Sequence, residues 1–347
     1  MSAAKLYGRA DMAKVTVVIP NYNGEGFLND CLASLMENLT GRDGALGAAD
    51  FDITVVDNGS TDGSIDIIEK AGAAMADRSG GRCRLELIRL DKNYGFPRAV
   101  NEGLKASDSE YVILLNNDTR VYPDFVSKLT EAIEKDRNIF SVSAGMLKMY
   151  EPDRMDNAGD LYCALGWAFA RGKDKPASVY DRKCDIFSAC GGAAIYRKAV
   201  FDRIGYFDED HFAYLEDVDV GYRARINGYR NVYEPEAVVL HAGSGSSGSR
   251  YNKFKIDLSS RNNVYVVYKN MPLLQLIINL PFLMAGTVIK TLFFIKKGEG
   301  ITYIKGFCKG VLMCFKGKKY PYKNANLGNY LRIQLELWGN IFIRFFG

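Results

Sequence analysis

The sequence predicts an α/β domain built on a mostly parallel sheet, followed by a basic helical appendage. Short β-branched runs alternate with stretches of helical periodicity in the N-terminal part, and this alternation is typical of a parallel sheet. Polar residues directly follow three of these runs, where such sheets bind ligands. The composition then changes: residues 290–347 hold eleven Lys or Arg and two acids, a net charge of +9 in a chain of +4, which leaves −5 for residues 1–289.

Four strands and two helices follow from the apolar pattern. The helical periodicity predicts helices over residues 25–39 and 97–105. The short apolar runs predict strands over residues 14–20, 52–56, 84–90 and 111–115. The polar segments 21–23, 57–60 and 116–118 come directly after three of these strands, so we expect a ligand to bind where they end.

Length and composition bound the domain organisation. A chain of 347 residues has room for one large domain and an appendage, and we expect a domain over residues 1–245 and a helical region over 246–347. An apolar content of 48% and a charged content of 25% are ordinary for a protein with a sizeable core. Seven cysteines without a CxxC pair favour reduced thiols in the cytoplasm over a disulfide frame or a zinc site.

Four carboxylates crowd into a short stretch, Asp210, Glu216, Asp217 and Asp219. A helix that begins after Leu215 places Glu216 and Asp219 on one face and Asp217 on another. Crowded carboxylates repel one another, so such a cluster is usually kept for a proton, a metal or a hydroxyl group. The alternative is a solvated first helical turn that the helix dipole stabilises.

The segment after the first predicted strand argues against two other nucleotide-binding classes. It reads NYNGEG and lacks the GxGxxG turn that binds the pyrophosphate of a dinucleotide. It also contains no Lys or Arg, whereas a nucleotidyltransferase usually has a basic, glycine-rich loop for a triphosphate. A nucleotide-sugar-binding protein without activity stays open, because it would keep the binding residues and need no catalytic carboxylate.

Five motifs occur in order along the chain: VVIPNYNG (17–24), VVDNGSTDGS (55–64), NYGFPRAVNEG (93–103), LLNNDT (114–119) and YLEDVD (214–219). Together they resemble the inverting family 2 glycosyltransferases, whose GT-A fold is a Rossmann-like architecture for nucleotide-diphospho-sugars. The likeness is greatest to the rhamnosyltransferase-type branch. It covers residues 14–245 and leaves the C-terminal region outside.

The resemblance implies a nucleotide-sugar donor site. Its nucleoside pocket would be lined by Pro20, Tyr22 and Asp57, and its further donor-binding residues would be Asn93, Arg98, Asn117 and Arg250. The carboxylate of Asp57 can accept a hydrogen bond from N3–H of uracil or thymine, so a dTDP- or UDP-linked donor is expected. The alternative for Asp57 is a turn in which it accepts hydrogen bonds from its own loop.

Asn116, Asn117 and Asp118 stand where the family carries an Asp-x-Asp metal motif. Asp118 can bind Mg²⁺ or Mn²⁺, and the ion would offset the charge of the leaving diphosphate. Asn116 departs from the motif and offers a neutral oxygen ligand. His241 would be a further ligand by resemblance, with a structural role as the alternative.

Asp217 corresponds to the catalytic base of the family, and Glu216 would orient the acceptor hydroxyl. Cys190, Gly191, Gly192 and Ala193 end a predicted strand with small residues, so backbone can approach a sugar there. Trp167 is a candidate platform for sugar stacking or, equally, a core residue. The Gly/Ser segment 243–249 is interpreted as a lid, with Arg250 reaching a phosphate, or as a plain linker.

The C-terminal region predicts helices suited to a membrane surface. Residues 271–289 are uncharged but contain two prolines. A polar stripe runs through this segment and beyond it and consists of Gln275, Asn279, Gly286, Lys290 and Lys297. Over residues 301–316, Lys305, Lys309 and Lys316 fall opposite Ile304, Phe307, Val311 and Phe315, as in an interfacial helix. The expected partner is the anionic cytoplasmic membrane rather than nucleic acid; a homodimer through these helices is the alternative.

The sequence therefore predicts an inverting glycosyltransferase on the cytoplasmic face of the membrane. The resemblance favours transfer of L-rhamnose from dTDP-rhamnose to a lipid-linked saccharide acceptor in the synthesis of a cell-surface polysaccharide. A transferase that uses a UDP-sugar is the main alternative.

Overall fold

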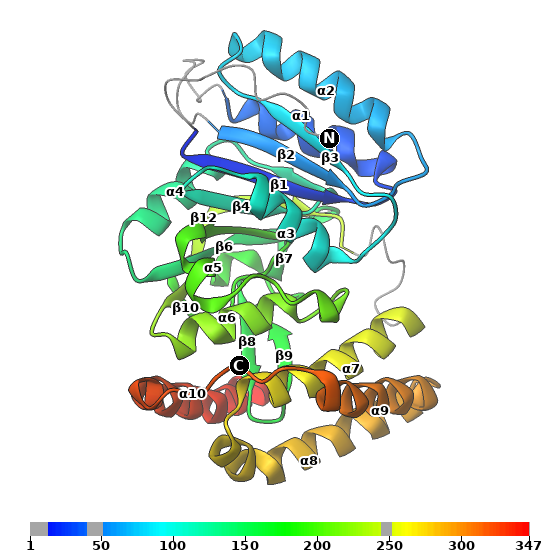
Figure 1. Cartoon of the computed structure of the whole chain (residues 1–347), viewed down its shortest axis with the longest axis vertical. Helices are drawn as coiled ribbons and strands as arrows, with labels where there is room; N and C mark the ends of the chain where they lie inside the picture. Colours follow the sequence, from blue (N-terminus) through cyan, green and yellow to red (C-terminus); the bar gives the residue numbers. More distant parts are fainter. Residues whose placement is uncertain (1–12, 40–50, 244–251, 347) are drawn as a thin grey trace.

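The structure is a computed structural model that describes residues 13–39, 51–243 and 252–346. It has two parts: a body built around a large sheet, and a group of four helices along one end of the body (Figure 1). The twelve strands of the described residues are β1 Val15–Asn21, β2 Phe51–Asp57, β3 Leu85–Arg89, β4 Tyr111–Leu115, β5 Thr119–Val121, β6 Ile139–Lys148, β7 Glu151–Asn157, β8 Asp160–Cys163, β9 Trp167–Ala170, β10 Cys184–Ile186, β11 Ala193–Arg197 and β12 Arg230–His241.

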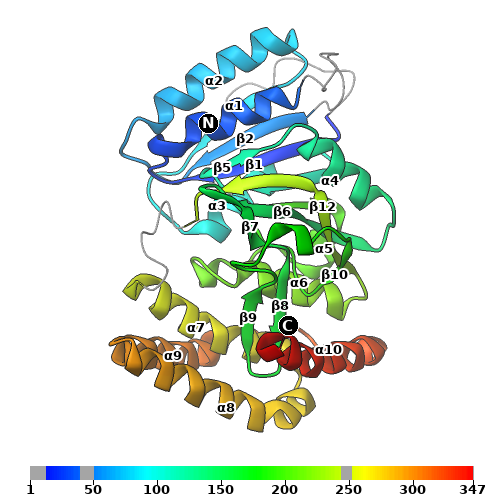
Figure 2. The same cartoon turned by 180° about the vertical axis from the view of Figure 1, so that it is seen from behind.

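Six helices belong to the body and four form the group at its end, which we call the helical layer. The body helices are α1 Glu25–Glu37, α2 Ser64–Ser79, α3 Phe96–Ala106, α4 Phe125–Glu134, α5 Lys198–Ile204 and α6 Glu216–Ile226. The helices of the helical layer are α7 Lys253–Asn270, α8 Leu273–Lys296, α9 Gly300–Lys316 and α10 Leu327–Phe346. α8 lies farthest from the body in both views (Figure 2).

The sheet of the body is parallel on one side and mixed on the other. Its main path runs β10-β12-β6-β11-β4-β1-β2-β3, with β5 paired to β12 and β7 paired to β6. The strands β3, β2, β1 and β4 are parallel neighbours, whereas β11 runs antiparallel to both β4 and β6. The carboxyl ends of β1 and β4 therefore lie side by side, as the sequence predicts.

Alternation along the strands buries both faces of the sheet. In β1, Val17 and Ile19 pack into a core that α1, α2 and α4 cover, while Val18 packs on the other face against α3. All three side chains are fully buried. A strand covered on both faces reads as a continuous apolar run, which explains why β1, β2 and β4 stand out in the sequence.

A two-stranded hairpin joins the body to the helical layer. β8 and β9 pair antiparallel outside the main sheet, and they point from the body into the helices in both views (Figures 1 and 2). The backbone N–H of Ala164, at the hairpin turn, donates to the carbonyl oxygen of Leu337 in α10 at 3.0 Å. Tyr162, Tyr222 of α6 and Leu337 belong to one buried cluster, so a hydrophobic core connects the two parts.

The structure confirms the predicted strands and helices of the N-terminal part and corrects one detail. The segment 190–193 precedes a strand rather than ending one, since β11 begins at Ala193. The helix predicted from Leu215 onward begins at Glu216. In the C-terminal region, α8 continues through Pro281; proline is compatible with a helix where the freed backbone groups are satisfied otherwise.

Candidate active site

A cleft of about 690 Å³ opens at the carboxyl ends of β1 and β4. Among the parts of the chain that meet there are the polar segments after these strands, the start of α6 and the end of β12. Its lining includes Pro20, Tyr22, Asn93, Asn116, Asn117, Asp118, Gly191, Gly192, Glu216, Asp217 and His241. Most of the site residues predicted from the sequence therefore face one cavity.

Asp57 does not line the cleft itself. Hydrogen bonds from neighbouring loops fix its carboxylate next to the lining residue Asn21. Its Oδ1 accepts from Nδ2 of Asn21 at 2.9 Å, and its Oδ2 accepts from the backbone N–H of Ser60 at 3.0 Å. Asn21 in turn accepts from Nδ2 of Asn117 at 2.7 Å. Asp57 is buried, so the turn that the sequence left as an alternative is present, and a contact of Asp57 with the base stays a prediction.

The loop around Asn93 is fixed by a close backbone approach at Gly95. The side chain of Asn58 donates to Oδ1 of Asn93 and to the carbonyl oxygen of Gly95, both at 3.1 Å. Gly95 has φ +89°, and a Cβ there would lie 2.3 Å from the carbonyl oxygen of Phe212. Only glycine fits at this contact. Arg98, by contrast, is paired with Glu209 and lies outside the cleft lining.

Asp118 and His241 form the metal-binding candidate. Nε2 of His241 lies 3.3 Å from Oδ1 of Asp118, and its Nδ1 lies 2.8 Å from Oδ2 of Asp156. Burial alone would lower the pKa of His241, but the two carboxylates raise it to about 9. A carboxylate oxygen and an imidazole nitrogen that converge in a cleft, with a second carboxylate orienting the imidazole, fit a divalent cation.

The turn before α6 has an unusual backbone that another region holds in place. Phe212, Tyr214 and Leu215 all have positive φ, between +59° and +72°. Nδ2 of Asn262, in α7, donates to the carbonyl oxygens of His211, Ala213 and Tyr214 at 2.7 to 3.0 Å. Positive φ is costly for residues other than glycine, so this amide compensates by satisfying the carbonyl groups of the turn.

Glu216 and Asp217 both face the cleft at the first turn of α6. Burial and the adjacent charge of Asp217 raise the pKa of Glu216, and its Oε2 has no hydrogen-bond partner among the described residues. Burial also raises the pKa of Asp217, although the backbone N–H of Gly191 donates to its Oδ2 at 3.2 Å. A raised pKa makes a carboxylate a better general base at neutral pH, because catalysis is most efficient when the pKa of the base lies near the working pH.

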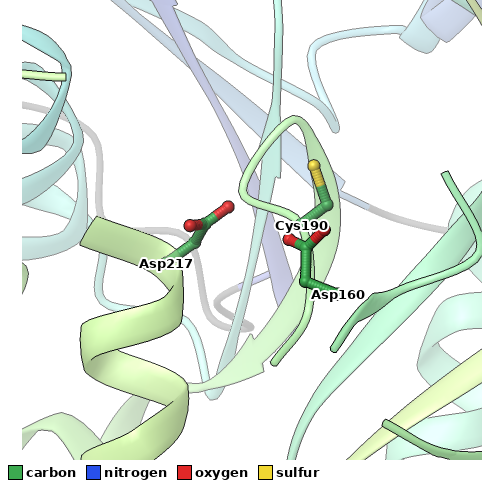
Figure 3. Close-up of side chains that lie close together, drawn as sticks. All are labelled: Asp160, Cys190 and Asp217. Carbon is green, nitrogen blue, oxygen red and sulfur yellow. The ribbon is translucent and has the colours of Figure 1, made fainter. Parts of the chain in front are cut away.

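A second carboxylate faces Asp217 across the cleft. Figure 3 shows Asp217 on the first turn of α6, with Cys190 and Asp160 on neighbouring segments opposite. The three residues place ligand atoms within 4.8 Å of one another. Burial and the charge of Asp217 raise the pKa of Asp160 to about 8, and burial raises that of the Cys190 thiol. A neutral thiol is a poor metal ligand, so the pair of carboxyl groups is better suited to share a proton.

Asp219 points away from the cleft and has a structural role. It is fully buried, and its Oδ2 lies 2.9 Å from Nζ of Lys269 and 2.9 Å from Nη2 of Arg223. Burial alone would raise its pKa, but Arg223 and Lys269 hold it well below its usual range. The structure thus contains the predicted Asp219–Arg223 pair, but groups Glu216 with Asp217 rather than with Asp219.

Besides Asp57 and Arg98, two further predicted site residues do not line the cleft or cannot be placed. Trp167 is buried next to the turn of the β8–β9 hairpin, where its ring centroid lies 6.3 Å from that of Phe345 and Nζ of Lys290 lies 5.3 Å from it. The core alternative therefore describes Trp167 better than sugar stacking does. Arg250 and the predicted lid fall outside the described residues, apart from Gly243 at the cleft.

Several lining residues were not foreseen from the sequence. They are Asp156 and Asp160 on the segment DNAGD, Lys173 after β9, and Phe254 and Lys255 at the start of α7. Their common feature is that they come from the end of β7, from the hairpin and from the helical layer, which the five motifs do not include. Asp156 and Asp160 were visible in the sequence as two acids close together. No spacing rule, however, predicts that they lie beside α6.

Comparisons with known proteins agree with this geometry. The sequence profile described as glycosyl transferase family 2 matches residues 16–205. The N-acetylglucosaminyl-diphospho-decaprenol L-rhamnosyltransferase of Mycobacterium tuberculosis is 26% identical over 221 residues, which cover 56% of this chain and 68% of that protein. The "uncharacterized protein y4gI" of Sinorhizobium fredii is 27% identical over 244 residues; the match covers 67% of this chain but only 25% of its relative.

Solved structures support the fold. The crystal structure of GalNAc-T7 with UDP, GalNAc and Mn²⁺ superposes with a TM-score of 0.56 at 18% identity, over 75% of this chain and 48% of that one. At this identity the likeness concerns the fold alone.

Proposed function

The chain belongs to glycosyl transferase family 2, and from this we propose that it is an inverting enzyme that transfers L-rhamnose from dTDP-rhamnose to a lipid-linked saccharide during the synthesis of a cell-surface polysaccharide. The observation that carries the proposal is that Asp217 faces the same cleft as Asp118 and His241. A base and a diphosphate site on one cavity are what the reaction needs. The choice of rhamnose and of a lipid-linked acceptor is supported by the name of the Mycobacterium tuberculosis relative, which includes both.

The roles of the carboxylates follow from the chemistry of inversion. Asp217 accepts the proton of the acceptor hydroxyl as that oxygen attacks the anomeric carbon from the face opposite the leaving nucleoside diphosphate. Glu216 and Asp217 lie side by side, and the raised pKa of Glu216 favours its protonated form, which can hold the acceptor hydroxyl by a hydrogen bond. Asp160 holds a further proton opposite Asp217, and Gly191 leaves room for the sugar.

A divalent cation, Mg²⁺ or Mn²⁺, fits between Asp118 and His241, with Asn116 as a neutral third ligand. When bound, it would offset the negative charge that builds up on the leaving diphosphate. Asp156 fixes the orientation of the His241 ring through Nδ1. Donor selection would fall to Pro20, Tyr22 and Asn117 at the nucleoside end of the cleft. A UDP-linked donor is the second candidate, because uracil carries the same N3–H as thymine.

We further propose that the helical layer rests on the cytoplasmic face of the membrane. α8 is long and apolar enough to cross a bilayer, with a mean hydropathy of 1.7 over its most apolar window. However, its polar stripe packs onto the protein: Oε1 of Gln275 accepts from Tyr222 at 3.1 Å, and Asn279 exchanges two hydrogen bonds with Gln334 of α10. These contacts favour a helix that lies in the plane of the interface over one that crosses it.

The test is nucleotide release from a panel of dTDP-, UDP- and GDP-sugars by the purified full chain, with Mg²⁺, with Mn²⁺ and with excess EDTA. We expect release from a dTDP- or UDP-sugar only when the metal is present, and its loss in Asp118→Ala. Arg120→Ala, an exposed neighbour outside the cleft, is the matched control. Full activity in EDTA contradicts the metal site, and tighter binding of GDP than of dTDP and UDP contradicts the pyrimidine pocket.

A further inference from the structure

A second cavity of about 530 Å³ adjoins the active-site cleft. The two cavities share four lining residues, Asp156, Phe169, Ala170 and Lys173. From this shared wall the second cavity extends along the β8–β9 hairpin to Ile343 and Arg344, near the end of α10. It therefore connects the place of the reaction with the helical layer.

The charge of this second cavity suits an anion. Its lining carries four basic side chains, Arg171, Lys173, Lys175 and Arg344, and one acidic side chain, Asp156, which gives a net charge of +3. Lys173 is paired with Asp156, so the binding of an anion would fall chiefly to Arg171 and Arg344. A concentration of cations around a concave surface attracts phosphate groups, which arginine binds through two parallel hydrogen bonds.

Arg171 is held in place without using all of its hydrogen-bond donors. Its guanidinium carbon lies 4.8 Å from the ring centroid of Tyr180 and 5.5 Å from that of Tyr233. Its Nη1 is buried and has no hydrogen-bond partner among the described residues. Because Nη1 is buried, an anion in the cavity would meet the other donors of this guanidinium, which the two rings hold in position at the cavity wall.

Apolar side chains also line this cavity. They are Leu161 and Phe169 of the hairpin and Ile343 of α10, and the guanidinium of Arg344 lies 5.7 Å from the ring of Phe169. Next along α10, Phe345 and Phe346 are exposed. The second cavity therefore offers a ligand from the cleft both basic side chains and apolar side chains near the end of α10.

We propose that this cavity binds the diphosphate of a prenyl-diphosphate-linked acceptor, with the saccharide directed into the cleft and the prenyl chain directed to the end of α10. The proposal rests on the proposed function, since it names how that same cleft receives its acceptor. The cleft, the basic side chains of the cavity and the apolar side chains near the end of α10 would receive the saccharide, the diphosphate and the prenyl chain of such a molecule. The donor diphosphate belongs at the other side of the cleft, between Asp118 and His241.

The experiment uses farnesyl diphosphate, a short and soluble prenyl diphosphate, and dTDP as the two probes, with Kd measured by calorimetry on the full chain. Arg344→Gln and, separately, Arg171→Lys should each raise the ratio of the farnesyl diphosphate Kd to the dTDP Kd by roughly tenfold, because each loses a charge-assisted hydrogen bond. Lys316→Gln is the matched control: it removes an exposed cation of the helical layer outside the cavity and should leave the ratio unchanged.

Three results would overturn the inference. Farnesyl diphosphate binding that is the same in both arginine variants shows that the cavity does not hold the diphosphate. Equal losses of dTDP and farnesyl diphosphate assign the cavity to the donor. Farnesol binding as tightly as farnesyl diphosphate leaves only an apolar site. Failure of the proposed function is distinguishable, because it appears as an absence of nucleotide release from every sugar donor by the wild-type chain.

Discussion

The body and the helical layer place their polar and apolar residues in opposite ways. In β4 of the body, all five residues are buried and apolar apart from the hydroxyl of Tyr111. In α8 the buried residues are Gln275, Asn279 and Gly286, while Leu273 and Met284 are 71% and 62% exposed. Membrane proteins pack helices through small and polar residues in this way, because lipid solvates their apolar faces. The two parts thus bury opposite kinds of side chain, and this difference supports the proposed contact of the helical layer with lipid.

α9 extends this contrast. The sequence places its lysines opposite an apolar face, as in an interfacial helix, and neither of these two faces makes the close contact with the protein. Gly306 and Gly310 face α7 so closely that a Cβ would lie 2.0 Å and 2.5 Å from atoms of Ser260 and Arg261. Because the glycine face makes the contact, both Lys305 and Leu312 remain exposed.

The largest effect should come from the catalytic carboxylate of the body. Asp217→Asn should lower kcat by a factor on the order of 10² to 10⁴ and leave donor binding nearly unchanged, as expected for loss of a general base. Initial rates and donor Kd values measure the two effects. Asp108→Asn, which removes an exposed carboxylate far from the cleft lining, is the control. Transfer at the wild-type rate by Asp217→Asn would show that another group accepts the proton.

The second effect concerns the junction between the two parts. Asp219→Ala should destabilise the protein by roughly 3–5 kcal/mol, because the positive charges of Arg223 and of Lys269 in α7 would stay buried without the carboxylate that pairs with both. Denaturant unfolding measures the change. Asp185→Ala removes an exposed partner of Arg230 and should cost about 0–1 kcal/mol. If both variants lost the same small amount, the helical layer would not depend on this buried ion pair.

The third effect depends on pH and belongs to the acceptor side of the cleft. Folded Asp160 keeps its proton up to a pKa of about 8, whereas an unfolded Asp loses it near pH 3.9. The folded state therefore binds more protons in this window, so this group lowers stability as pH rises from about 4 to about 8. Asp160→Asn cannot ionise, and its stability relative to wild type should increase by roughly a few kcal/mol across the window.

Thermal unfolding of both proteins from pH 5 to pH 9 tests this difference. The same substitution removes no charge below about pH 8, because Asp160 is protonated there, so the acidic limb of the activity profile should stay in place. Stability curves that stay parallel over the whole range would mean that Asp160 is ionised in the folded protein.

The body could be predicted from the sequence much better than the acceptor side could. Strands such as residues 15–21 bury both faces and end at polar turns, so the run and its end are visible locally. The acceptor side combines Asp160, Asp217 and Asn262, which come from three elements with no fixed spacing between them. Asn262 illustrates the difficulty: it looks like a polar residue of an ordinary helix, and only packing brings it under the carbonyl groups of the α6 turn.

The C-terminal region was only partly predicted for a related reason. The polar stripe of α8 was visible at 100° per residue, and its direction could not be read from the sequence, since a stripe can face water or protein. Its contacts with Tyr222 and Gln334 settle the direction, because these side chains satisfy Gln275 and Asn279. The same contacts explain why the apolar side of α8 is left outside.

The smallest effect tests whether lipid covers that apolar side. Leu280→Asn combined with Met284→Asn should weaken binding to phosphatidylcholine vesicles that contain phosphatidylserine, by roughly 1.5–3 kcal/mol for each side chain that enters the bilayer. Because the apolar component does not depend on salt, the loss should persist at high ionic strength. Lys305→Gln should cost about 1 kcal/mol, and only at low salt. Wild-type chain that ignores these vesicles at low salt and sediments as a dimer would assign the apolar face to a second copy.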